Sequence, residues 1–267
     1  MIRLSEIITE LERFAPPELK EPWDNVGLMV GDETQIIKKV FVCLDLTTEN
    51  MRQAIDFGAD LIVSHHPLIF TPLRSITERD PIASIIRTAI KNDISIYSMH
   101  TNFDKTDGGM NDLLADKLAL ENIRPFTESE CIDSEGKTFS PIGRVGNLEL
   151  PMTLEDFARQ VKAVLGCTAL KYSGDLSEDI ETVALCSGSG GRECMYAAYN
   201  SGADVYLTAD LKHDIAMTAY ELGLNMIDAG HFETENIICE FLQEFFETQF
   251  PEIEVMTSDA EPFYFSI

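Results

Sequence analysis

The stretch Leu61-Ile62-Val63-Ser64-His65-His66-Pro67 decides how this chain is organised. Its apolar residues predict a short buried strand, and Pro67 can neither donate to a sheet ladder nor continue most elements. The two imidazoles therefore lie at a strand end, where α/β proteins hold their functional groups. Both rings can turn toward one crevice there, so the pair is suited to serve two metal ions. The alternative is that His65 caps a turn and His66 packs.

The positions of the other histidines favour the metal interpretation. The chain has five: His65, His66, His100, His213 and His231. His100 and His231 each follow a strand-like run, and each is followed four residues later by a carboxylate, Asp104 and Glu235. Nitrogen and carboxylate ligands in a mixed set suit zinc, manganese, iron or nickel. His213 lies early in a predicted helix, where we expect it to be structural or at a cavity rim.

The first half of the chain has the rhythm of a parallel α/β unit. Residues 38–45 predict a strand and residues 48–57 a helix, followed by the strand that ends at His65. Asp80-Pro81 is a strong helix start, because aspartate caps and proline is tolerated at the first helical position. Residues 82–91 are therefore a helix, and the next strand leads to His100. A first helix is expected from Ser5, as N-cap, to Phe14.

The second half of the chain echoes the first. Residues 143–150 predict a strand and 153–165 a helix. After them Val183-Ala184-Leu185-Cys186 resembles Val40-Phe41-Val42-Cys43, and Thr208-Ala209-Asp210 stands where the first copy has Ser64-His65-His66. The fold class is therefore α/β, with a first lobe over residues 1–125, closed by part of the C-terminal segment, and a second over 126–267. Two related lobes facing each other would bring both sets of ligands into one cleft.

Composition limits the classes of function. The chain has 267 residues, 45% of them hydrophobic, and 46 acidic against 20 basic residues give a formal charge of −26. That charge repels nucleic-acid phosphates, so no direct nucleic-acid binding is expected. No run of eighteen apolar residues or secretion signal is present, so we expect a cytoplasmic protein without membrane contact. The six cysteines form no C-x-x-C pair and predict small core residues in a reducing compartment.

Two further features have two interpretations each. Trp23, the single tryptophan, is expected to pack in the core, with a place lining a cleft as the alternative. The glycine-rich loop from Ser187 to Gly191 comes between a strand and a helix. Its backbone amides could hold an anion, and a tight strand-to-helix connection explains it equally well.

Four motifs in the right order carry a resemblance to a known family. They are Trp23-Asp24-Asn25-Val26-Gly27-Leu28, Ser64-His65-His66-Pro67, His100-Thr101-Asn102-Phe103-Asp104 and Gly230-His231-Phe232-Glu233-Thr234-Glu235. Together they resemble the Nif-three-like family, also described as GTP cyclohydrolase I type 2 homologues and as dinuclear-metal-centre hexameric proteins. The resemblance runs almost from end to end, and the chain looks like the short form of the family, without the domain that some members insert between the lobes.

The resemblance implies a toroidal homohexamer with two divalent ions in each subunit. By the family pattern, His65 and His66 would each bind a different ion, Asp104 one of them, His231 the other, and Glu235 both. His100 is open between three roles: a group orienting a ligand or the bound water, a general base, and plain packing.

Two classes of function fit these residues. The first is a metal-dependent hydrolase of a small molecule, with GTP ring opening as the family's nominal activity. The second is a non-catalytic hexamer that binds or delivers metal or forms a scaffold for protein partners. Nothing in the sequence displays a guanine pocket or decides the metal, so substrate and ion identity stay open.

Overall fold

The computed structural model describes residues 1–126, 131–132, 138–139 and 142–265. The chain divides into two compact units, each described here by itself. Unit 1 consists of Met1–Thr106 and Ile238–Glu261, and unit 2 of Asp107–Ile237 and Pro262–Ile267. Residues 107–125 lie in unit 2, whereas the sequence predicts a boundary near residue 125. The reason is strand pairing, because residues 121–125 form a strand at the edge of the sheet of unit 2.

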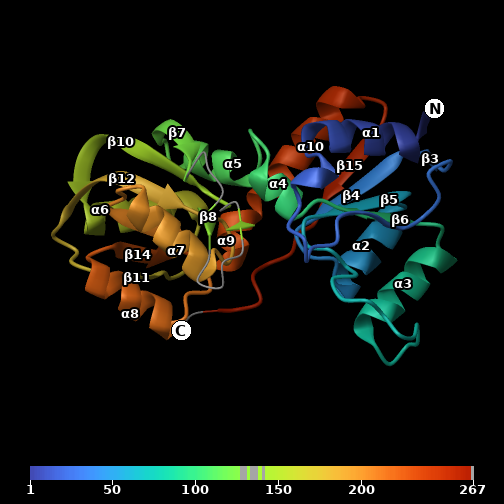
Figure 1. Cartoon of the computed structure of the whole chain (residues 1–267). Helices are drawn as coiled ribbons and strands as arrows, with labels where there is room; N and C mark the ends of the chain where they lie inside the picture. Colours follow the sequence, from blue (N-terminus) through green and yellow to red (C-terminus); the bar gives the residue numbers. More distant parts are fainter. Residues whose placement is uncertain (127–130, 133–137, 140–141, 266–267) are drawn as a thin grey trace. The chain divides into compact units, whose positions relative to one another are not determined.

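Unit 1 is built on a five-stranded sheet (Figure 1). Its order is β15 (Glu254–Thr257), β4 (Lys39–Cys43), β5 (Leu61–Ser64), β6 (Ser95–Ser98) and β2 (Gly27–Val30). The first four strands are parallel, and β2 runs antiparallel to β6. The helices are α1 (Leu4–Phe14), α2 (Thr48–Phe57), α3 (Pro81–Lys91), α4 (Thr101–Lys105) and α10 (Ile237–Gln249). A short 3₁₀ helix, η1 (Pro17–Leu19), and a ribbon of β1 (Ile2–Arg3) with β3 (Ile36–Ile37) complete it.

Local sequence explains where these helices begin. Asp80 accepts a hydrogen bond from the amide of Ala83 at 3.0 Å and Pro81 is the first residue of α3, as predicted. The expected cap of α1 is wrong: the helix starts one residue before Ser5. The Glu6 carboxylate accepts from the amide of the N-cap residue Arg3 at 2.8 Å, and the amides of Leu4 and Ser5 donate to the carbonyl oxygens of residues 35 and 33.

Unit 2 is built on a six-stranded mixed sheet. Its order is β11 (Lys171–Ser173), β14 (Asn225–Asp228), β13 (Val205–Thr208), β12 (Asp179–Leu185), β10 (Arg144–Thr153) and β7 (Glu121–Pro125). The three central strands β14, β13 and β12 are parallel, and the flanking strands are antiparallel to their neighbours. The helices are α5 (Met110–Lys117), α6 (Leu154–Leu165), α7 (Gly191–Asn200), α8 (His213–Leu222) and α9 (His231–Glu235). Strands β8 (Cys131–Ile132) and β9 (Thr138–Phe139) pair with each other.

Apolar side chains of the central strands pack on both faces of this sheet. Leu185, Leu207 and Ile227 pack in one apolar cluster, together with residues of α5 and α6. Their neighbours Tyr206 and Met226 pack in another, with residues of α7 and α8. Successive side chains point to opposite faces, so one strand serves both layers. The functional groups are left to the strand ends.

Candidate metal centre

Three histidines of unit 1 gather at the carboxyl ends of adjacent parallel strands. His65 and His66 directly follow β5, and His100 follows β6 at the start of α4. The ring centroids of His65 and His66 are 5.0 Å apart, and His100 is 5.2 Å from His65 and 5.5 Å from His66. One nitrogen from each ring lies within 4.8 Å of the others. This spacing fits a group of metal ligands.

The Nδ1 atom of each of these rings is held by a protein oxygen. His65 Nδ1 lies 2.7 Å from the carbonyl oxygen of Met99, and His66 Nδ1 lies 2.8 Å from Asp45 Oδ1. His100 Nδ1 lies 2.8 Å from Asp24 Oδ1. Carbonyls and ionised carboxylates only accept hydrogen bonds, so each Nδ1 carries the proton. In the neutral ring the lone pair is then on Nε2, as in metal-bound histidines supported by carboxylates.

Asp24 is ionised at neutral pH, which makes it a firm acceptor for His100. Burial raises the pKa of this carboxyl, but hydrogen bonds from His100 and Thr101 outweigh that effect and bring the pKa down to about 2. The Thr101 hydroxyl donates to Asp24 Oδ2 at 2.6 Å and the Thr101 amide at 3.1 Å. The carboxylate is therefore fixed from two sides, and the orientation of the His100 ring is fixed with it.

Asp104 adds a carboxylate to the histidine cluster of unit 1. It lies in the single turn of α4, and its Oδ1 is 3.5 Å from His65 Nε2. Both side chains are almost fully buried. A ring nitrogen lone pair and a carboxylate oxygen that face each other in a buried site are stabilised by a cation or a proton between them. The donor set fits a divalent metal.

Unit 2 presents a similar arrangement at the end of β14. His231 and Glu235 are the first and last residues of α9, and His231 Nε2 lies 2.9 Å from Glu235 Oε2. The other nitrogen, Nδ1, lies 2.8 Å from Asp210 Oδ2, which follows β13. The imidazole is therefore placed between two carboxylates. A metal ion bound at Nε2 would take the position that a proton can otherwise occupy.

A glycine brings the backbone against this pair. Gly188 has a φ of +55°, and a Cβ built on it would lie 2.0 Å from Glu235 Oε1 and 3.0 Å from His231 Nε2. Its amide donates to Thr234 Oγ1, and the neighbouring Gly190 amide donates to Thr208 Oγ1. Two amides of the loop are thus engaged within unit 2, which supports the tight connection over the anion-holding interpretation. A Cβ at position 188 would therefore require the Glu235 carboxylate to move.

Three sequence expectations outside the cluster have clear outcomes. His213 is exposed at the first turn of α8. Trp23 is 56% exposed, so the expectation of core packing is wrong, since its neighbour Asp24 is the residue that the turn buries. The described cysteines are buried, as expected of core residues: Cys43, Cys167, Cys186, Cys194 and Cys239. Cys131 lies outside the residues whose side chains the structure describes.

Sequence reasoning missed the residues that hold the histidines. Asp45 and Asp210 each come two residues after a parallel strand, at the same sheet edge as the ligands they support. That position is a usable signal, because the carboxyl edge of a parallel sheet gathers functional groups. Asp24 lies in a turn distant in sequence, and only its pairing with His100 identifies it.

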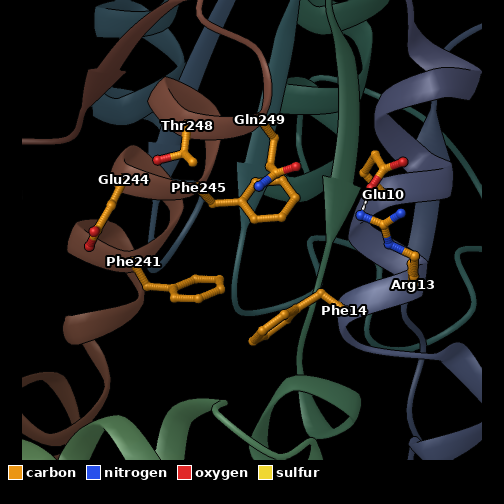
Figure 2. A pocket seen from close by; sticks show the side chains of 8 residues that line it. All are labelled: Glu10, Arg13, Phe14, Phe241, Glu244, Phe245, Thr248 and Gln249. Carbon is orange, nitrogen blue, oxygen red and sulfur yellow. Dashed lines mark ion pairs between the residues drawn. The ribbon is translucent and has the colours of Figure 1, made fainter.

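Unit 1 also has a groove between α1 and α10. Figure 2 shows Phe14 of α1 and Phe241 and Phe245 of α10 around this space, whose volume is about 490 Å³. The rings of Phe14 and Phe241 are 4.8 Å apart. The rim carries Glu10, which pairs with Arg13, and no histidine or cysteine contributes to its lining. Its chemistry suits apolar contact rather than metal binding.

Fold and site together define an α/β protein with carboxylate-supported histidines at the carboxyl ends of parallel strands. The model of the family Duf34/NIF3 (NGG1p interacting factor 3) matches residues 2–262, and the chain belongs to that family. A Clostridium perfringens relative, named GTP cyclohydrolase 1 type 2 homolog, is 40% identical over 234 residues, which cover 88% of this chain and 87% of the relative.

Solved structures agree with this assignment. A Bacillus cereus protein related to NIF3 superposes with a TM-score of 0.88 at 27% identity, covering 100% of this chain and 99% of that one. A Staphylococcus aureus hypothetical protein gives a TM-score of 0.88 at 30% identity and covers 99% of both chains. The mixed α/β fold is therefore that of NIF3-related structures. Among the described residues, no helix is long and apolar enough to cross a membrane.

Proposed function

We propose that this chain is a divalent-metal-binding protein that hydrolyses a small molecule. The observation that carries the proposal is the support given to four histidines. In His65, His66, His100 and His231 a carbonyl or carboxylate oxygen holds Nδ1, which places the lone pair on Nε2. Metal-binding histidines almost always donate their other ring N–H to an acceptor of this kind.

The proposed ligands are His65, His66 and Asp104 of unit 1 and His231 and Glu235 of unit 2. Zinc, iron, manganese and nickel all suit a set of imidazole and carboxylate donors. The number of ions, two per chain, is carried over from the family resemblance. A bound divalent ion supplies Lewis acidity and lowers the pKa of water to near neutrality.

His100 is proposed as the group that takes the proton from the attacking water. Asp24 holds its Nδ1 and fixes the ring, and the ring lies beside both His65 and His66. With Nε2 as the basic atom and a fixed ring, His100 has the geometry of a general base. Its nitrogen also lies close enough to the other two rings to be a ligand, so metal content of a His100 variant decides between the roles.

The arrangement of both units supports an internal repeat. In unit 1 the strands β4, β5 and β6 are parallel and joined by α2 and α3, and in unit 2 the strands β12, β13 and β14 are parallel and joined by α7 and α8. The third strand of each set leads to a histidine followed four residues later by a carboxylate. We propose that the two units are related copies.

Elemental analysis of protein reconstituted separately with each metal tests the proposal. We expect close to two ions per chain and a clear loss in Glu235→Ala. Glu221→Ala removes an exposed glutamate of α8 in unit 2 and is the control, which should keep the full content. One ion or none in the wild-type protein contradicts the proposal.

Turnover separates the hydrolase from its alternative. The metal-loaded protein is screened against GTP, phosphoesters and small peptides, with chelator-treated protein as the control. Metal-dependent turnover supports the hydrolase. Full metal content without turnover of any of the three classes favours the non-catalytic metal-binding scaffold.

Assembly as a homohexamer is proposed from the family resemblance. The groove between α1 and α10 offers half-buried phenylalanine surface of the kind that subunit contacts cover (Figure 2). Light scattering at micromolar concentration is expected to give six times the chain mass. A stable monomer contradicts this part of the proposal.

A further inference from the structure

Two exposed aromatic side chains stand beside the histidine cluster of unit 1. Trp23 is 56% exposed and Phe70 48% exposed. Their ring centroids are 5.8 Å apart at an interplanar angle of 65°. Large aromatic side chains usually give up their surface to the core, so two of them exposed together next to functional groups indicate a binding surface.

The His100 ring completes a triangle with these two. Its centroid lies 6.2 Å from Trp23 and 6.3 Å from Phe70, and both pairs meet edge to face. The sides of the triangle are thus nearly equal, and one corner is the proposed base. A ligand that contacts Trp23 and Phe70 is therefore held close to the His100 ring.

The backbone that presents both aromatics is fixed. The Asn25 side chain donates to the carbonyl oxygen of Ile69 at 2.6 Å, which ties the turn carrying Trp23 to the segment carrying Phe70. Asp24, between Trp23 and Asn25, is held by Thr101 and His100. The residues next to Phe70 and Trp23 are therefore anchored, although the two rings face solvent. A surface that is ordered before its ligand arrives loses little entropy on binding.

We propose that Trp23 and Phe70 bind a planar heteroaromatic ring of the substrate and hold it beside His100. Aromatic side chains stack on such rings with little dependence on the ring's substituents. A ring N–H group has an acceptor at hand in His100 Nε2, which a purely aliphatic group would not use. The formal charge of −26 favours recognition through ring and hydrogen bond over recognition through a polyanion. This inference deepens the proposed function and rests on it for the reaction at His100.

Trp23 also supplies the measurement, because it is the only tryptophan of the chain. Its fluorescence is followed during titration of the chelator-treated and the zinc-loaded protein with nicotinamide or guanosine. Cyclohexanecarboxamide, which carries the same amide on a saturated ring, and ribose, which lacks the base, are the controls. N-acetyltryptophanamide titrated with the same compounds corrects for collisional quenching.

We expect saturable quenching by nicotinamide and guanosine and none by the two controls. Phe70→Leu keeps an apolar side chain and the tryptophan reporter, and should weaken binding of the planar rings about 5- to 100-fold. Tyr199→Leu makes the same kind of change at an exposed aromatic of unit 2 and should leave the affinity unchanged.

The possible failures are distinguishable. Zinc bound at the expected level without saturable quenching by either planar compound overturns this inference and leaves the metal proposal standing. If the protein takes up no zinc during loading but still shows saturable quenching, the result supports the aromatic site and counts against the metal proposal. Equal binding of nicotinamide and cyclohexanecarboxamide, or an unchanged affinity in Phe70→Leu, also overturns the inference.

Discussion

Replacing Gly188 with alanine should weaken metal binding by the proposed ligands His231 and Glu235 without unfolding the chain. The new methyl group would lie 2.0 Å from Glu235 Oε1, whereas ordinary van der Waals contact begins at 3.4 Å. The carboxylate must therefore retreat by about 1.4 Å, and His231 Nε2, now 3.0 Å away, by about 0.4 Å. Ligand geometry has to hold within roughly 0.5 Å, so the displacement breaks it.

Two losses are expected in Gly188→Ala, one in metal affinity and one in the stability of the folded state. A disturbed ligand environment costs about 10- to 100-fold in metal affinity. Alanine at a φ of +55° also destabilises the folded state by about 1–2 kcal/mol. Zinc affinity is measured by competition with a chromophoric chelator, and folding by thermal denaturation monitored by circular dichroism.

Gly202→Ala is the matched control for this variant. Gly202 also belongs to unit 2, has a φ of +79° and has nothing within 4 Å of the position of a Cβ. It should lose the same amount of stability and keep the zinc affinity of the wild-type protein. A folded Gly188→Ala protein with wild-type affinity, or an equal loss of zinc in Gly202→Ala, would refute the reasoning.

Three further predictions concern the ligands and the thiols. His231→Ala should lose metal, whereas His100→Ala should keep it and lower any turnover by about 10² to 10⁴; an ion missing from His100→Ala makes that residue a ligand. Asp210→Asn should weaken metal binding about 10- to 100-fold, because the amide no longer fixes the His231 tautomer; unchanged affinity in chelator competition would count against it. Burial raises the pKa of Cys239 to about 12, so in Cys131→Ser protein the native state should react slowly with Ellman's reagent at pH 8 and the urea-unfolded state at once. Rapid reaction of the native protein would show that these thiols are accessible.

The strand ends were predictable from the sequence because their signals are local. Apolar runs that stop at His65 and His66, and the Asp80-Pro81 helix start, each depend on a few adjacent residues. Strand-like runs before His100 and His231 likewise indicated β6 and β14. The α/β class and the family follow from such patterns.

The supporting residues were not predictable because their roles depend on distant pairing. Asp24 and His100 are 76 residues apart, and nothing near Asp24 indicates that its carboxylate is buried against an imidazole. The same holds for Trp23, whose size favours the core although the fold leaves it exposed. The pairing of the edge strand over residues 121–125 was not predictable either, because its partner β10 begins about 20 residues later.

The place of β15 in unit 1 has a consequence for synthesis on the ribosome. This strand pairs with β4 from the far end of the chain, and Cys43 and Glu254 are about 210 residues apart. At roughly 5–20 residues per second, β4 waits about 10–40 s for that neighbour. The residues of unit 2 are nearly all made during this interval, so the inserted unit can fold while the unit that begins the chain is incomplete. A nascent chain stalled before Glu254 exposes one edge of β4, which makes it a substrate for chaperones and for mispairing with other chains.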